Sequence, residues 1–207
     1  MSNTYRTFKD YEVYSYKLEV KRSVFIGYAK RVDSVVAANE FVQQVRAKHS
    51  DVSHACWGYA IGANQEIQRS TDDGEPGGTA GVPILQSILK NSGNGPLSDV
   101  ISVVVRYFGG VLLGAGGLVR AYSEASAKTI AGALQTSRKL ENIYKVTAPL
   151  ASAGKVENQF RASGHVPIAT DYSATAIELT VPLPDLSLVG QLQLSAELID
   201  TQWVDEV

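Results

Sequence analysis

The residues best suited to chemistry in this sequence lie in a glycine-rich segment that follows a run of β-branched residues. The segment contains Gly109, Gly110, Gly114, Gly116 and Gly117. We expect it to join a strand to the N-terminus of a helix, where free backbone N–H groups and the helix dipole favour an anion. Arg106 and Arg120 flank the segment and could supply forked donors to a phosphate. The sequence therefore predicts an anion-binding site.

A second interpretation of these residues stays open. The glycines could serve only positive-φ turns and close packing, with Arg106 held by a local carboxylate. The segment lacks both the Walker lysine and the G-x-G-x-x-G order, so neither nucleotide fingerprint applies.

An acidic segment from Ser70 to Gly81 carries three carboxylates beside another glycine-assisted helix start. Asp72, Asp73 and Glu75 could hold Mg²⁺, which prefers oxygen ligands, but clustered acids in a loop are more often simply solvated. We assign no metal and no cofactor to the segment. We expect it to line the same cleft as the glycine-rich segment, with these lining residues: His54, Asp73, Gly74, Glu75 and Thr79.

His54 and Cys56 lie two residues apart, so both side chains point to one face of an expected strand. An imidazole near a thiol could activate it as a nucleophile. We favour a structural role for Cys56, because buried cysteines commonly act as small hydrophobic residues. No catalytic residue is assigned.

Basic residues interleaved with aromatic ones occur near the start of the chain, as on surfaces that bind single-stranded nucleic acid. They are Lys17, Lys21, Arg22, Lys30 and Arg31, with Tyr16, Phe25 and Tyr28 between them. A solvated edge strand protected by lysines has the same pattern, and we favour that interpretation.

The periodicity of the first 138 residues predicts an α/β domain that positions these segments. Expected strands are 16–21, 24–29, 54–62 and 99–107, and expected helices run from about 33 to 48, from 78 to 89 and from 118 to 134. The strand 99–107 is continuously hydrophobic and should be central in its sheet. The strand at His54 should have one bulky face and one small face.

Hydrophobic patterning stops near Arg138 and restarts with a strand at 144–148. A helix at 154–163, strands near 166–172 and 175–181, a helix at 185–193 and a strand at 198–204 follow. This β-α-β-β-α-β order is that of a ferredoxin-like domain. We therefore expect an α+β protein with two domains, 1–138 and 139–207.

Composition and charge limit the classes of function. The content of 44% hydrophobic and 19% charged residues is ordinary for a soluble globular protein. A single cysteine excludes a disulfide framework, and the polar start and the absence of a long hydrophobic run predict a cytoplasmic protein without a membrane span. The net charge is +3 through Glu141 and −5 beyond it. A polyanionic partner would therefore bind the first domain.

Two long motifs occur in an order that resembles the IMPACT family. They are D-D-G-E-P-G-G-T-A-G-V-P from Asp72 to Pro83, and V-V-V-R-Y-F-G-G-V-L-L-G-A-G-G-L-V-R-A-Y from Val103 to Tyr122. The K-R-S-V-F-I run at Lys21 and the H-A-C run at His54 resemble weaker family positions. The resemblance is close over the first domain and extends to the second by order and length only.

The resemblance implies a first domain similar to the second domain of a small-subunit ribosomal protein. It implies a second domain similar to the fifth domain of elongation factor G. In the family that the sequence resembles, eukaryotic members are linked to restraining the kinase that phosphorylates a translation initiation factor, through binding its activator, and bacterial members lack that pathway. Family members commonly have lysines where Val82 and Leu112 stand here. The loss of both lysines, with the acidic second domain, weakens the attraction for phosphate and RNA.

Together these observations favour a regulatory or binding protein linked to translation. It would bind RNA, a ribosomal component or a translation-associated protein through the glycine-rich cleft. The alternative is a magnesium-dependent enzyme that acts on a phosphoester or a nucleotide. The oligomeric state is open.

Overall fold

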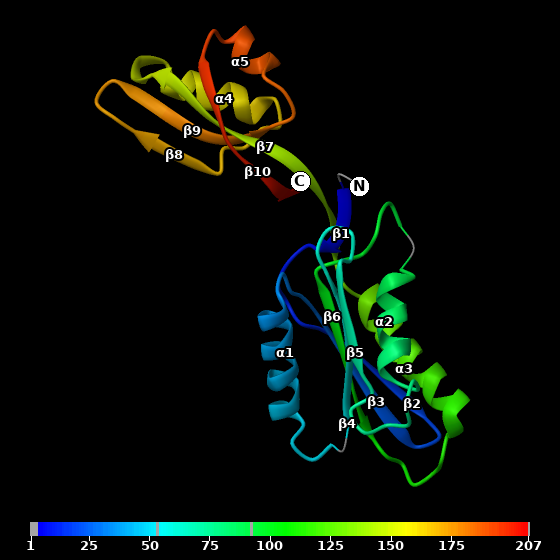
Figure 1. The fold of residues 1–207 in the computed structure, drawn as a ribbon. Coiled ribbons are helices and arrows are strands. Elements are labelled where there is room, and N and C mark those ends of the chain that lie inside the picture. The colour runs from blue at the N-terminus through cyan, green and yellow to red at the C-terminus, as the bar shows by residue number, and fades with distance from the viewer. Residues whose placement is uncertain (1–3, 53, 92, 207) are drawn as a thin grey trace. The chain divides into compact units, whose positions relative to one another are not determined.

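The computed structural model describes residues 4–52, 54–91 and 93–206, so Met1 to Asn3 of the polar start lie outside the described residues. The chain divides into two compact units, Met1–Arg138 and Lys139–Val207. Figure 1 labels their helices and strands.

The first unit is built on a five-stranded antiparallel sheet with the strand order β2-β3-β6-β4-β5. Helix α1 covers one face, and α2 and α3 cover the other (Figure 1). The strands of the unit are β1 (Thr4–Phe8), β2 (Tyr14–Val20), β3 (Ser23–Arg31), β4 (His54–Ile61), β5 (Ile67–Thr71) and β6 (Val100–Tyr107). The helices are α1 (Val35–Lys48), α2 (Gly81–Leu89) and α3 (Gly114–Ala131).

The central position predicted for the most hydrophobic strand is confirmed. β6 lies between β3 and β4, and every residue from Val100 to Arg106 is buried. Successive side chains of a strand point to opposite faces, so Val103 packs on the α1 side while Val104 packs on the side of α2 and α3. A strand covered on both faces has no polar face, which is why its sequence is continuously hydrophobic.

The predicted bulky and small faces of β4 are also confirmed. Tyr59 packs in the α1 cluster and Cys56 in the cluster of α2 and α3. Gly58 allows the backbone of α2 to approach closely, because a Cβ there would stand 2.8 Å from the amide nitrogen of Leu85. Residues on the small face thus set the distance between sheet and helix.

Three elements differ from the expectations. β1 and β5 were not among the expected strands, and each is a short strand of five residues. Helix α3 begins at Gly114 rather than at Leu118, so Gly114, Gly116 and Gly117 lie inside its first turns and not in a loop before it.

The expected basic cluster is divided between two places. Lys21 and Arg22 form the turn between β2 and β3, whereas Arg31 is buried at the far end of β3 and donates to the carbonyl of Phe8. β2 is an edge strand with mostly exposed side chains, as the favoured interpretation of this segment required.

The second unit has a ferredoxin-like topology, and the predicted α+β class is confirmed. Its sheet order is β8-β9-β7 with β10 on the outer side of β7. Helices α4 and α5 contribute Val156, Phe160 and Val189 to the core under this sheet. The elements are β7 (Gln135–Pro149), a 3-10 turn (Leu150–Ser152), α4 (Ala153–Ala162), β8 (Ala169–Tyr172), β9 (Ala176–Leu183), α5 (Ser187–Gln191) and β10 (Ser195–Asp205).

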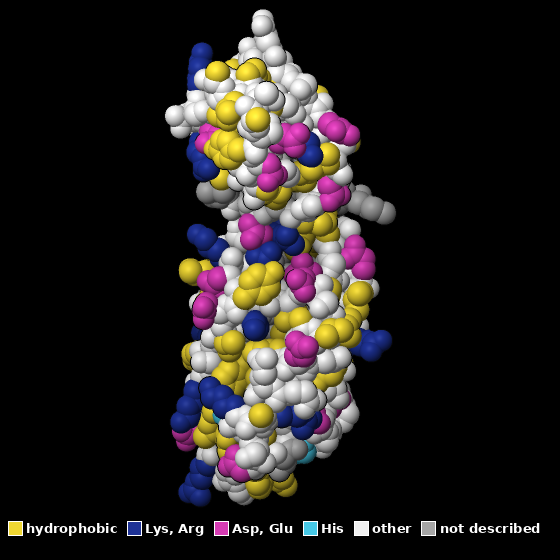
Figure 2. Space-filling model, turned by 90° about the vertical axis from the view of Figure 1, so that its left-hand side faces the viewer, with side chains coloured by type: hydrophobic (Ala, Val, Ile, Leu, Met, Phe, Trp, Pro, Cys, Tyr) yellow, Lys and Arg dark blue, Asp and Glu magenta, His cyan; other side chains and the backbone are white. Residues whose placement is uncertain are grey.

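No helix in the described parts of the chain is both long enough and hydrophobic enough to cross a membrane. On the face drawn in Figure 2, hydrophobic, acidic and basic side chains are interspersed.

Candidate functional site

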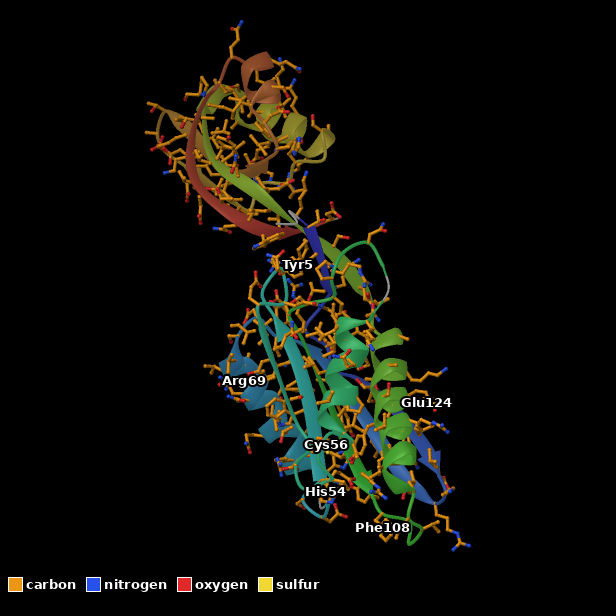
Figure 3. The ribbon with its side chains drawn as sticks, turned by 45° about the vertical axis from the view of Figure 1, so that its right-hand side comes forward. Tyr5, His54, Cys56, Arg69, Phe108 and Glu124 are labelled. Carbon is orange, nitrogen blue, oxygen red and sulfur yellow. The ribbon has the colours of Figure 1, made fainter. Side chains whose placement is uncertain are left out.

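A cavity of about 490 Å³ opens where β4 begins and β6 ends, beside the first turns of α3. Figure 3 shows His54 and Phe108 at this same end of the sheet, and Tyr5 at the opposite end. The lining residues are His54, Gly74, Glu75, Pro76, Arg106, Phe108, Leu112, Leu113, Gly114, Ala115 and Leu118. The two motif segments therefore meet at one cavity.

Arg106 forms a buried ion pair at the floor of this cavity. Its Nη1 donates to both carboxylate oxygens of Glu75, at 2.9 and 3.2 Å. The Tyr122 hydroxyl donates to the same carboxylate at 2.6 Å. The side chains of Arg106 and Glu75 are only 8% and 3% exposed. Arg106 thus has the local carboxylate partner that the second interpretation of its role required.

The remaining donors of Arg106 are poorly matched. Its Nη2 is 3.5 Å from the Ser23 hydroxyl, and its buried Nε has no hydrogen-bond partner among the described residues. The guanidinium lies near two aromatic rings, 5.6 Å from that of Phe25 and 5.3 Å from that of Phe108. One edge of the guanidinium, formed by Nε and Nη2, therefore lacks a good acceptor.

The acidic segment is held by its own hydrogen bonds. Asp72 accepts from the backbone N–H groups of Gly78, Ala80 and Gly81, and so fixes the start of α2. Burial by itself would raise the pKa of Asp72, but these three donors outweigh burial and hold the pKa below its usual value. Asp72 therefore acts as a cap for α2.

Asp73 has a different set of partners. It accepts from the Ala55 amide and forms an ion pair with Arg46. Within the described residues, no group of three or more His, Cys, Asp and Glu side chains is arranged to hold a metal ion. The carboxylates that could have held Mg²⁺ are thus engaged in organising the loop.

His54 and Gly74 are neighbours in the lining of the cavity. His54 Nδ1 is 2.7 Å from the carbonyl oxygen of Asp73, so Nδ1 carries the proton and donates it there. Gly74 has a φ of +88°, and a Cβ at this position would stand 3.0 Å from His54 Nδ1. In the neutral imidazole this arrangement leaves Nε2 as an acceptor.

Cys56 is buried next to this cavity but does not line it. Burial raises the pKa of its thiol to about 12, and nearby Glu75 and Asp73 act in the same direction while Tyr122 opposes them. The thiol donates to the carbonyl oxygen of Asp72 at 2.9 Å. Because the thiolate is the reactive form, these surroundings give Cys56 a structural role.

The predicted glycines have separate functions. A Cβ at Gly109 would overlap the backbone of Arg22, so this glycine permits close packing. Gly110 and Gly114 have φ values of +79° and +73° with open space around them. The structure brings His54, Gly74, Glu75, Arg106 and Gly114 to the cavity. The other predicted site residues do not line the cavity: Asp73, Thr79, Gly109, Gly110, Gly116, Gly117 and the exposed Arg120.

Two features of the site escaped the sequence analysis. Phe108 and Leu112 line the cavity with 59% and 84% of their surface exposed, although both are hydrophobic. Lys21 and Arg22 form a two-residue turn with φ values of +47° and +66°, directly against Gly109. One signal for the exposed hydrophobic residues was that Leu112 stands where family members commonly have a lysine, which is a surface residue. For the turn, the signal was the alternating pattern of the segments on both sides of Lys21 and Arg22.

Comparison with known proteins gives consistent results. The Impact N-terminal domain matches residues 21–130. A Bacillus subtilis protein described as IMPACT family member YvyE is 40% identical over 163 residues, which are 79% of this chain and 72% of that protein. The Escherichia coli IMPACT family member YigZ is 36% identical over 192 residues, which are 88% of this chain and 86% of that protein.

A solved structure has the same fold over nearly the whole chain. It is described as the crystal structure of an hypothetical protein, and it covers 97% of this chain and 99% of its own, with a TM-score of 0.64 and 29% identity. The match to the Impact N-terminal domain includes the cavity and both motifs, and the relatives extend the similarity to most of the chain. This protein belongs to the IMPACT family.

Proposed function

We propose that this protein regulates translation by binding and that its partner is RNA, contacted through the cavity of the first unit. Membership of the IMPACT family supports a translation-related regulatory role in general. The finer assignment to RNA depends on the residues around the cavity.

The observation that carries this proposal is the exposed aromatic ring at the mouth of the cavity. Phe108 is 59% exposed and lies 5.3 Å from the guanidinium of Arg106. The basic turn of Lys21 and Arg22 packs against the same segment through Gly109. Aromatic platforms beside basic groups are how proteins bind single-stranded nucleic acid, because every base can stack and every phosphate is attracted.

The glycine-rich segment has a supporting role in this proposal. Helix α3 begins at Gly114, and the N–H groups of its first turn have no partners within the helix. Arg120 is an exposed cation on the same helix and would add to the general attraction for a phosphate. The anion site predicted from the sequence thereby becomes a phosphate contact of a larger RNA surface.

Binding of a labelled single-stranded RNA to the full chain tests the proposal. Phe108→Ala should weaken binding by about 1–3 kcal/mol, the usual contribution of one stacked base, and Phe108→Trp should retain it. Arg69→Ala is a matched control, because Arg69 is an exposed cation on β5 outside the cavity lining. Replacing both Lys21 and Arg22 with alanine should reduce the salt dependence by about two counter-ions.

Two results would refute the proposal. One is the absence of RNA binding by the wild-type chain at low salt. The other is binding that Phe108→Ala and the Lys21/Arg22 double variant reduce no more than Arg69→Ala does. In that second case the RNA would be held by another part of the surface.

A further inference from the structure

We propose that the first unit holds an acidic amphipathic helix of a protein partner in a groove between α2 and α3. The groove is a second hollow of the surface, with a volume of about 590 Å³, and it is lined by residues of both helices. It shares no lining residue with the cavity described above. The inference therefore goes beyond the proposed function and does not depend on RNA binding.

The groove is bounded by two rows of side chains, one from each helix. The helices α2 and α3 lie side by side (Figure 1). Residues at four-residue intervals lie one above the other on a helix, so each row forms a continuous wall. The two rows are Val82, Gln86 and Lys90 along α2 and its C-cap, and Val119, Ser123 and Ala127 along α3.

The length of the rows fits two turns of a helix. From Val82 to Lys90, and from Val119 to Ala127, the helix advances by roughly 12 Å at 1.5 Å per residue. A helix that binds in a groove contacts it through residues three or four apart over about two turns. An extended segment of that length has only about four residues, of which alternate ones face away. The dimensions therefore favour a helix as the occupant.

One end of the groove is apolar. Val82 and Val119 line it from the two helices and are 49% and 38% exposed. Further along, Ser123 and Ala127 have small side chains, and the distance between packed helices decreases with the size of the side chains at the contact. A partner helix can thus approach closely, and covering the two valines with its own aliphatic residues drives its association.

The other end of the groove is basic. Lys90 is exposed and is the one charged residue among the described residues that line the groove. The exposed row of α3 next to the groove wall adds two cations and one carboxylate, namely Arg120, Lys128 and Glu124, the last of which Figure 3 labels. This charge is complementary to an acidic partner. The matching helix has an apolar pair at positions i and i+4, and a carboxylate four residues beyond the pair, opposite Lys90.

The test uses the full chain and a library of soluble helical peptides, each about 18 residues long because shorter helices are marginal in water. Positions i and i+4 vary among leucine, alanine and serine, and the positions four residues beyond the pair on either side vary among glutamate, glutamine and lysine. Selection on the wild-type chain should enrich leucine at the pair and glutamate at one flanking position. Selection on Lys90→Glu should enrich lysine at that flanking position instead.

A selected peptide is then titrated against variants of the groove. Val82→Gln combined with Val119→Gln should weaken its binding about tenfold or more, because the contact would bury two polar groups without partners. Val36→Gln is the matched control, since Val36 is an exposed valine of α1, on the other face of the sheet. It should leave the affinity unchanged, and melting temperatures show whether the variants are folded.

Several results would overturn the inference. They are the enrichment of no common pattern on the wild-type chain, a preference for glutamate that persists on Lys90→Glu, and equal affinity of the selected peptide for the wild type and the folded double valine variant. Sedimentation of the wild type as a dimer that the double valine variant dissociates would assign the groove to a second copy of the chain. Because the double variant changes neither the charge nor the cavity, its RNA binding should match that of the wild type. The proposed function therefore stands or falls separately.

Discussion

At the scale of single residues, the cavity combines a buried ion pair with an incomplete set of partners. Burying Arg106 and Glu75 costs solvation free energy, which the hydrogen bonds from Arg106 and Tyr122 to the Glu75 carboxylate offset in part. The same surroundings change the pKa of Tyr122. Burial raises the pKa of its hydroxyl, and the nearby Cys56 and Glu75 raise it further. Removing one member of such a group leaves the others without compensation.

Arg106→Ala should lower the free energy of unfolding by about 3–5 kcal/mol, because Glu75 would remain buried without its cation. Arg120→Ala is the control, since Arg120 is exposed and its loss should change stability by less than about 0.5 kcal/mol. Urea unfolding followed by circular dichroism measures both. If the two variants prove equally stable, the pair is not structural.

His49 gives the first unit a stability that depends on pH. It is buried at the end of α1, with Nε2 2.7 Å from the Tyr28 hydroxyl and Nδ1 2.8 Å from the Tyr107 hydroxyl. Burial, and then the charge of Lys48, lower the pKa of His49, while Asp51 opposes them. The unfolded chain therefore binds the proton at higher pH than the folded one, and stability rises with pH in this window.

We expect the contribution of His49 to be complete above about pH 6.5, the ordinary histidine value, and to be lost as the pH falls toward the lower folded pKa. Urea unfolding at pH 7.5 and pH 5.5 should show this loss in the wild-type chain. His49→Gln should be less stable at pH 7.5 but should lose less on acidification. An unchanged pH dependence in His49→Gln would assign the effect to other groups.

At the scale of secondary-structure elements, small residues on the inner face of the sheet decide how closely the helices approach. Gly58 faces the backbone of Leu85 in α2, and Gly27 faces Thr129 and Ala125 in α3. These contacts fix the positions of α2 and α3, and so the wall of the cavity that α3 supplies.

Gly58→Ala should therefore destabilise the protein by about 1–3 kcal/mol, because its Cβ would stand 2.8 Å from the Leu85 nitrogen and force α2 outward. Gly116→Ala is the matched control. It lies in α3 with no atom within 4 Å of its added Cβ, so it should stabilise the protein by up to about 1 kcal/mol. Thermal unfolding of the two variants gives the comparison, and equal effects would contradict the packing argument.

The strongly patterned elements were predictable from sequence, and the site was predictable only in part. The buried strand β6 and the amphipathic α1 have clear periodicity, so both were expected. β5 was missed because it is a short edge strand with largely exposed, polar side chains. The first turns of α3 were missed because glycine is a poor helix former, and tertiary contacts override this preference.

Partners distant in sequence could not be predicted. Arg106 and Glu75 are 31 positions apart, and only the antiparallel placement of β4 next to β6, with the loop before α2, brings them together. A local carboxylate partner for Arg106 was one of the two interpretations of the sequence, the other being a bound anion. The exposed position of Phe108 was not foreseen, because phenylalanine is among the residue types most often buried.

At the scale of the whole molecule, the first unit should fold independently. Residues at the start of β7 tie the end of this unit to its first strand, β1. The Gln135 side chain accepts a hydrogen bond from Arg6 at 2.7 Å, and Arg138 donates to the Tyr5 hydroxyl at 2.9 Å. The unit carries a net positive charge and the rest of the chain a net negative one. Binding to a polyanion is therefore expected from the first unit alone.

A fragment that ends at Arg138 should unfold in one cooperative transition. A fragment that ends at Leu134 loses the contacts of Gln135 and Arg138, so it should be less stable while its sheet and its cavity remain. Denaturant unfolding followed by both fluorescence and circular dichroism tests this. Gradual unfolding of the longer fragment, when the full chain unfolds cooperatively, would place the boundary elsewhere.

The turn between β2 and β3 has an evolutionary consequence. Positive φ values at both of its central residues are those of a type I′ turn, for which asparagine and glycine are the preferred residues. Lys21→Asn with Arg22→Gly should therefore raise the melting temperature, while removing two cations beside the cavity. Selection for thermal stability and selection for charge would oppose each other at these two positions. Relatives adapted to high temperature should show which of the two requirements prevails.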